Sequence, residues 1–124
     1  MSVREVDIDE AIRLRDAGRV VVDVREPFEW DAGHVAGALH IPLAQLADRI
    51  ASELPDKSAP LLFYCHSGAR SGRAAQYLVA NGYEDVANLK ALIDGWPGRG
   101  GAWEVSEVEP TFGEAAASTP RSPA

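Results

Sequence analysis

Two short apolar runs, V-V-V-D-V at 20–24 and L-L-F-Y-C at 61–65, most constrain what this chain can fold into. Neither run alternates apolar with polar side chains, a pattern typical of strands buried on both faces, as in a parallel sheet. Helical patterns lie between and around the runs. Strands that alternate with helices predict β-α-β units. We therefore expect an α/β fold in three layers: a central, mostly parallel sheet of four to five short strands, with helices on both faces.

The remaining segments follow the same alternation. Asp7 is the expected N-cap of the first helix, because Glu10 follows three residues later and Gly18 supplies the stop. The other expected elements, in chain order, are a short helical turn from Pro27 closed by Gly33, a very short strand around 39–41, an amphipathic helix over 43–54, a helix beginning near Ser71 or Gly72 and closed by Asn81-Gly82, a strand in 85–89, a short helix in 90–96, a glycine-rich loop over 96–103 and an edge strand in 104–109.

The length of 124 residues suits one domain and is too short for two of ordinary size. From about Thr111 the composition shifts to Ala, Ser, Thr and Pro. We therefore predict one folded domain over 1–109 and a disordered C-terminal tail over 110–124.

The formal net charge of −7 argues against binding to nucleic acid or to a membrane surface, since both need clustered Lys and Arg. The first ten residues lack the basic and apolar regions of a secretory signal, and the longest apolar stretch is far too short for a membrane helix. The expected location is a reducing cytoplasm. The single cysteine excludes an internal disulfide, a cysteine-based metal cage and a resolving thiol within the chain.

That cysteine, Cys65, stands where the second apolar run ends and the turn H-S-G-A-R-S begins. Ligands of open parallel sheets bind beyond the carboxyl ends of the strands, and the position suggests a sulfur that a substrate can reach. Backbone N–H groups of 66–71, with the donors of the following helix, could converge on a thiolate and lower its pKa. No Asp or Glu occurs from Ser58 to Tyr83. The alternative is a structural cysteine, because free cysteines are usually buried.

The spacing from Cys65 to Arg70 is Cys-x4-Arg. A phosphatase loop that encircles a phosphate needs Cys-x5-Arg, so the loop is one residue too short for a phosphatase or an arsenate reductase. A tighter ring suits a single sulfur atom carried on the cysteine, which is a persulfide.

Three motifs in this order, D-V-R-E at 23–26, G-H-x-x-G-A-x-x-I-P at 33–42 and C-x-S-G-x-R-S at 65–71, make the chain resemble the rhodanese-like single-domain sulfurtransferases over roughly residues 3 to 105. The resemblance implies a small α/β domain and a thiosulfate sulfurtransferase whose cysteine cycles through a persulfide. Thiosulfate is the usual donor, cyanide or a thiol the acceptor, and a protein can also accept the sulfur. No cofactor or metal is implied.

Carried over to this chain, the resemblance makes Cys65 the catalytic nucleophile and sulfur carrier. Arg70 closes the loop and is expected to pair with Asp23 or Glu26, with Asp23 slightly ahead because it ends a neighbouring strand. His66 and Arg73 would attract an anionic donor at the rim. The persulfide would be held by the backbone amides of His66, Ser67, Gly68, Ala69, Arg70 and Ser71.

Several other residues have simpler interpretations. Arg25 is expected to form a structural pair at the end of its strand, and His34 to hold the loop after Trp30 by hydrogen bonding. The three histidines lack metal-ligand spacing. The tryptophans are expected to pack, although Trp96 could line the pocket mouth. A non-catalytic binding or sulfur-sensing module remains the second functional hypothesis, in which the loop only docks a partner.

Overall fold

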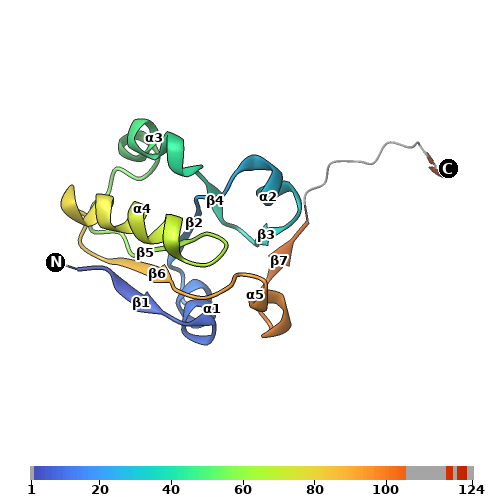
Figure 1. The fold of residues 1–124 in the computed structure, drawn as a ribbon, viewed down its shortest axis with the longest axis horizontal. Coiled ribbons are helices and arrows are strands. Elements are labelled where there is room, and N and C mark those ends of the chain that lie inside the picture. Colours follow the sequence, from blue (N-terminus) through green and yellow to red (C-terminus); the bar gives the residue numbers. More distant parts are fainter. Residues whose placement is uncertain (1, 106–116, 119, 123–124) are drawn as a thin grey trace.

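The computed structural model describes residues 2–105, 117–118 and 120–122, and its centre is a five-stranded parallel sheet (Figure 1). Every neighbouring pair of strands in this sheet runs in the same direction. The strands lie in the order β1 (Arg4–Val6), β6 (Val86–Leu89), β5 (Leu61–Tyr64), β2 (Val20–Asp23) and β4 (Leu39–His40).

Helices cover both faces of the sheet. On one face lie α3 (Leu46–Glu53) and α4 (Ala69–Ala80), and on the other α1 (Ile8–Asp16) and α5 (Gly95–Gly98). Beyond the carboxyl end of β2 lies the short helix α2 (Pro27–Asp31). The smaller elements are the antiparallel pair β3 (His34–Val35) and β7 (Trp103–Glu104), the 3-10 turn η1 (Leu43–Gln45), and the pair β8 (Ala117–Ser118) and β9 (Pro120–Ser122).

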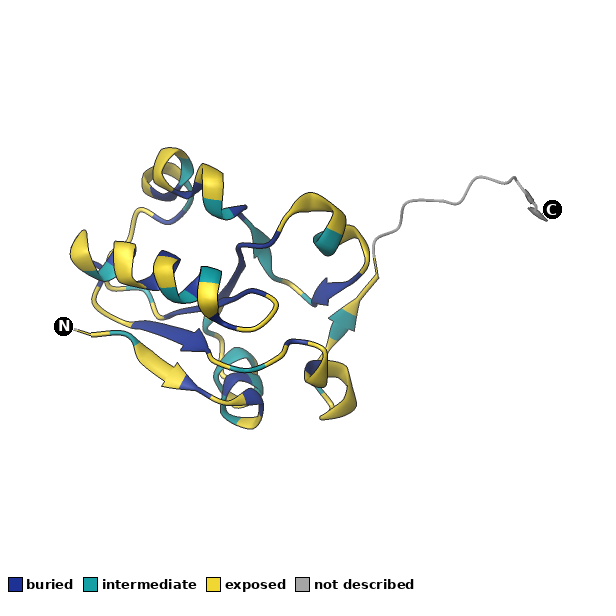
Figure 2. Cartoon of the chain, viewed as in Figure 1, coloured by how far each residue is buried: buried dark blue, intermediate teal, exposed yellow. Residues whose placement is uncertain are grey.

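Two hydrophobic clusters, one on each face of the sheet, form the core. Val22 and Phe63 pack toward α3 and α4, whereas Val21 and Leu62 pack toward α1 and α5. Strands β5 and β6 are therefore buried along their whole length, and β2 is buried except at Val20, while α3 and α4 expose their outer sides (Figure 2). This arrangement explains why the two runs carry no polar alternation. The α/β fold with a parallel sheet and helices on both faces is confirmed.

The local predictions hold at some element ends and fail at others. The Asp7 side chain accepts a hydrogen bond from the Glu10 backbone N–H, and α2 begins at Pro27. The prediction that α4 begins near Ser71 or Gly72 is wrong: it begins at Ala69, because Gly68 adopts a positive φ of 104° and caps it. The short helix predicted in 90–96 lies later, as α5, after a loop over 90–94.

The predicted edge strand in 104–109 is represented by β7, and residues 106–109 lie outside the described residues. Most of the segment 110–124 also lies outside them, so its disorder stays a prediction. Among the described residues, no helix has the length and apolar character needed to cross a membrane.

Candidate active site

Cys65 follows β5 directly, at the carboxyl edge of the sheet. The residue is only 2% exposed, less than its place at the end of a strand suggests, and it takes part in the core beneath α3 and α4. Its sulfur is nevertheless surrounded by donors. The Gly68 backbone N–H donates to Sγ over 3.1 Å, and the hydroxyl of the fully buried Ser71 donates over 3.4 Å. An inert core cysteine does not need such donors.

These contacts change the acidity of the thiol. Burial raises the pKa of Cys65, because a charged sulfur is costly to desolvate. Hydrogen bonds from the Ser71 hydroxyl and from the backbone N–H groups of Ser71, Gly68 and Ser67 lower the pKa. Their combined effect is larger, so the pKa lies below its ordinary value. The surroundings therefore favour a thiolate, the nucleophilic form of cysteine.

The loop from Cys65 to α4 is held against the segment that follows β6. The Ile93 backbone N–H donates to the His66 carbonyl over 2.9 Å. At Gly68, a Cβ atom would lie 2.9 Å from the Leu89 carbonyl oxygen and 3.1 Å from the Lys90 Cα. Only glycine fits here, for its left-handed backbone and for this close approach. The backbone of the loop is thus in contact with the backbone of the segment after β6, and this contact fixes the direction of the Gly68 N–H.

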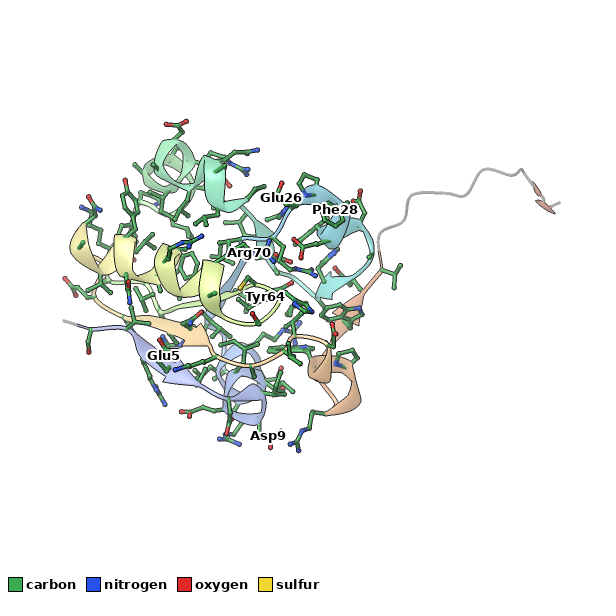
Figure 3. All side chains as sticks on the ribbon, in the orientation of Figure 1. Glu5, Asp9, Glu26, Phe28, Tyr64 and Arg70 are labelled. Atoms are coloured by element: carbon green, nitrogen blue, oxygen red, sulfur yellow. The ribbon has the colours of Figure 1, made fainter. Side chains whose placement is uncertain are left out.

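Arg70 does not pair with Asp23 or Glu26, and this prediction is wrong. Its guanidinium donates instead to both oxygens of Glu29, over 2.8 and 3.0 Å. Glu29 lies on α2, where its carboxylate also accepts the Glu26 backbone N–H in a capping box. Figure 3 shows Arg70 at the start of α4, on the side of α2. The pair links the loop to α2, and the Arg70 hydrogen bonds lower the pKa of Glu29 to about 2.

Asp23 belongs to a separate buried network behind the loop. It accepts hydrogen bonds from the Arg25 guanidinium and from the Tyr64 hydroxyl, over 2.8 and 2.5 Å. The Tyr64 hydroxyl in turn accepts the Val35 backbone N–H, and Arg25 donates to the Gly33 carbonyl. The structural pairing of Arg25 is confirmed. Asp23 is fully buried and already accepts hydrogen bonds from these partners, which explains why Arg70 pairs with Glu29 instead.

The side chains of the remaining candidate residues form no hydrogen bond with the sulfur. His66 is exposed, with its Nε2 3.7 Å from Asp94. Arg73 is exposed on α4 and lines a hollow with Leu43 and Tyr77. Glu26 is exposed at the N-cap of α2.

The aromatic predictions concern the region around β3. The His34 Nδ1 donates to the Trp30 carbonyl over 3.1 Å, as predicted, and Trp96 is fully buried as a packing residue. Trp30 stacks on both His34 and His40. Within the described part of the chain, no three His, Cys, Asp or Glu side chains gather as metal ligands.

The link between Arg70 and Glu29 predicts a dependence of stability on pH. The folded pKa of about 2 lies below the ordinary value of 4.5, so the carboxylate stabilises the fold above about pH 4.5. This stability is lost as the pH falls toward 2. Because the pair is partly exposed, Glu29→Gln should lower the free energy of unfolding by only about 0.5–1 kcal/mol at pH 7. Urea unfolding from pH 7 to pH 3 measures the difference, which should shrink with acid. Glu84→Gln, just before the amino end of β6, controls for the lost charge.

Fold and site together define an open parallel α/β domain with a hydrogen-bonded cysteine in a short loop at the carboxyl edge of the sheet. The family model for the rhodanese-like domain matches residues 7–98 of this chain. The chain belongs to the rhodanese-like domain family.

Individual relatives agree with this assignment. The uncharacterized protein YqhL of Bacillus subtilis is 46% identical over 79 residues, which are 64% of this chain and 61% of YqhL. The thiosulfate sulfurtransferase GlpE of Pseudomonas entomophila is 37% identical over 93 residues, which are 75% of this chain and 84% of GlpE. The crystal structure of the Alr3790 protein from Anabaena sp. superposes with a TM-score of 0.73 at 27% identity, covering 88% of this chain and 99% of that one. This chain thus spans less than two thirds of YqhL.

Proposed function

We propose that this protein is a sulfurtransferase that carries sulfur as a persulfide on Cys65. The single observation that carries the proposal is the set of donors on Sγ, the Gly68 N–H at 3.1 Å and the Ser71 hydroxyl at 3.4 Å. They favour a negatively charged sulfur in a place where burial alone would oppose one. The likeness to GlpE, a thiosulfate sulfurtransferase, supports the same chemistry.

The reaction is a double displacement. The Cys65 thiolate attacks the outer sulfur of thiosulfate. A new S–S bond forms at Sγ, the S–S bond of thiosulfate breaks, and sulfite leaves with its electron pair. In the second step cyanide or a thiolate attacks the outer sulfur of the persulfide, and Cys65 returns to the thiolate. With cyanide the product is thiocyanate. Charge balances in both steps, and neither step needs an oxidant, a metal or a cofactor.

The loop residues have distinct parts in this proposal. The N–H groups of Ser67, Gly68 and Ser71 hold the resting thiolate. The N–H groups of His66, Ala69 and Arg70 complete the ring around the outer sulfur of the persulfide. Burial of Cys65 keeps water and bulky oxidants from the sulfur.

The side chains outside the ring have two roles, one in holding the loop and one in attracting the substrate. Arg70, held by Glu29, keeps the first turn of α4 in place. The exposed His66 and Arg73 attract the anionic donor toward the loop. Cys65 takes the outer sulfur of the donor there and, as the persulfide, passes it to a small acceptor or to a protein thiol.

Two other functions compete with this one. A phosphatase or arsenate reductase is disfavoured by the loop, because Cys-x4-Arg is one residue short for a ring around phosphate. A binding or sulfur-sensing module would use the same fold without turnover. The lowered pKa of Cys65 favours a reacting thiol over a docking loop.

Mass spectrometry of the protein after incubation with thiosulfate tests the proposal directly. We expect the peptide that contains Cys65 to gain the mass of one sulfur atom, and cyanide to remove it with release of thiocyanate. Hydrolysis of p-nitrophenyl phosphate, measured beside it, should stay at background. Persulfide formation without turnover in the presence of cyanide or a thiol would indicate the sensing module instead.

A further inference from the structure

Asn88 is a buried polar residue next to the cysteine loop, and neither the fold nor the proposed reaction has yet given it a role. It lies on β6, between Phe63 of β5 and Glu5 of β1 in the sheet register, and is 1% exposed. Its side-chain amide Nδ2 donates to the Gly68 carbonyl over 3.3 Å and to a Glu5 carboxylate oxygen over 3.2 Å. Figure 3 labels Glu5 on β1, at the edge of the sheet.

The other end of the same amide is unsatisfied. The Asn88 Oδ1 is buried without a hydrogen-bond partner among the described residues. A buried acceptor without a partner costs folding free energy, whereas a leucine of similar shape at this strand position would not. Stability alone therefore does not account for an asparagine here. The hydrogen bonds that the Asn88 Nδ2 donates must therefore have a role that an apolar side chain could not fill.

The Asn88 Nδ2 acts on Gly68, the residue that contacts the sulfur. The Gly68 carbonyl accepts both the Asn88 amide and the Gly72 backbone N–H, which donates over 2.9 Å. Two donors from different elements fix the orientation of this carbonyl. Gly68 is also the residue whose N–H donates to Sγ. With its carbonyl held, rotation of Gly68 away from Cys65 would break hydrogen bonds at both of its ends.

We propose that Asn88 is a positioning residue of the Cys65 loop: from strand β6 its Nδ2 holds the Gly68 carbonyl and thereby keeps the Gly68 N–H directed at the sulfur. Its effect on turnover rests on the proposed function, but its effect on the thiol does not. The unsatisfied Oδ1 is the structural cost of placing a donor at this point.

Asn88→Leu tests the proposal, because it removes the donor and the unsatisfied acceptor together. We expect the pH profile of Cys65 alkylation by iodoacetamide to shift upward, and the alkylation rate at pH 6.5 to fall about threefold to tenfold, as one weakened hydrogen bond to a charged sulfur implies. The thermal unfolding midpoint should stay equal to wild type or rise. A merely structural asparagine would give the reverse, a lower midpoint with the wild-type alkylation profile, and that result would overturn the proposal.

Asn81→Leu is the matched control. The Asn81 side-chain amide also donates to a backbone carbonyl of α4, that of Tyr77 over 2.7 Å, but at the far end of the helix. Its alkylation profile should equal that of wild type. If Asn88→Leu does not fold, Asn88→Ser replaces it, since the shorter serine side chain does not reach the Gly68 carbonyl. An unshifted profile in that variant would equally overturn the proposal. Alkylation needs no sulfur donor, so a wild-type protein that gains no sulfur from thiosulfate would refute the proposed function and leave this result standing.

Discussion

Replacing Cys65 by serine is expected to abolish sulfur transfer, with loss of activity by roughly three orders of magnitude or more, the scale seen when a catalytic nucleophile is removed. A serine hydroxyl stays protonated at neutral pH, and the donors around position 65 do not ionise it. Cys65 is also the only cysteine of the chain, so no other thiol can take over the sulfur. Thiocyanate formation from thiosulfate and cyanide measures the loss.

The fold of Cys65→Ser must be shown to be intact for this result to count. Serine is close to cysteine in shape, and the Gly68 N–H and the Ser71 hydroxyl remain as partners for its oxygen. We therefore expect a far-UV circular dichroism spectrum and a thermal midpoint near those of wild type. Thiocyanate formation at the wild-type rate would contradict the proposed mechanism, because sulfur would then pass without a carrier on the chain.

The parts of the fold that the sequence predicted are those whose cause is local. The two apolar runs became β2 and β5 because all their side chains except that of Val20 are buried, on both faces of the sheet, and that burial leaves a readable pattern. The strands β1 and β3 leave no such pattern. In β1 only Val6 is buried, and β3 consists of two residues paired with β7 far along the chain. Their existence depends on partners that the local sequence does not specify.

The same distinction between local and distant causes applies to the residues of the candidate site. Cys65, Gly68 and Arg70 lie close together in the sequence, so their spacing indicated the site. The partner of Arg70 was missed because Glu29 lies outside the recognised D-V-R-E motif, whereas Asp23 and Glu26 belong to it. One signal was available: Glu29 follows Glu26 by three residues just after Pro27, the pattern of a capping box. Asn88 lies in an apolar strand and gave no comparable signal.

Gly68→Ala should damage both the stability and the reactivity of the protein. Its φ of 104° lies in a region that alanine resists, at a cost of about 1–2 kcal/mol. The new Cβ would also lie 2.9 Å from the Leu89 carbonyl oxygen and 3.1 Å from the Lys90 Cα. Both are main-chain atoms and cannot turn aside, so crowding should add about 1–3 kcal/mol. Urea unfolding should therefore show a total loss of about 2–5 kcal/mol.

Gly18→Ala separates the two causes. Gly18 has nearly the same φ, 107°, but a Cβ there would meet nothing within 4 Å. This variant should lose only the conformational cost and keep the wild-type thiol reactivity. In Gly68→Ala the displaced loop should turn the N–H away from Sγ, raise the pKa of Cys65 and lower sulfur transfer by about tenfold or more, as the loss of one hydrogen bond to a charged group implies. Equal losses of stability in the two variants, with equal alkylation profiles, would mean that the loop tolerates a side chain at position 68. The contact between Gly68 and the segment after β6 would then not be what aligns the donor with the sulfur.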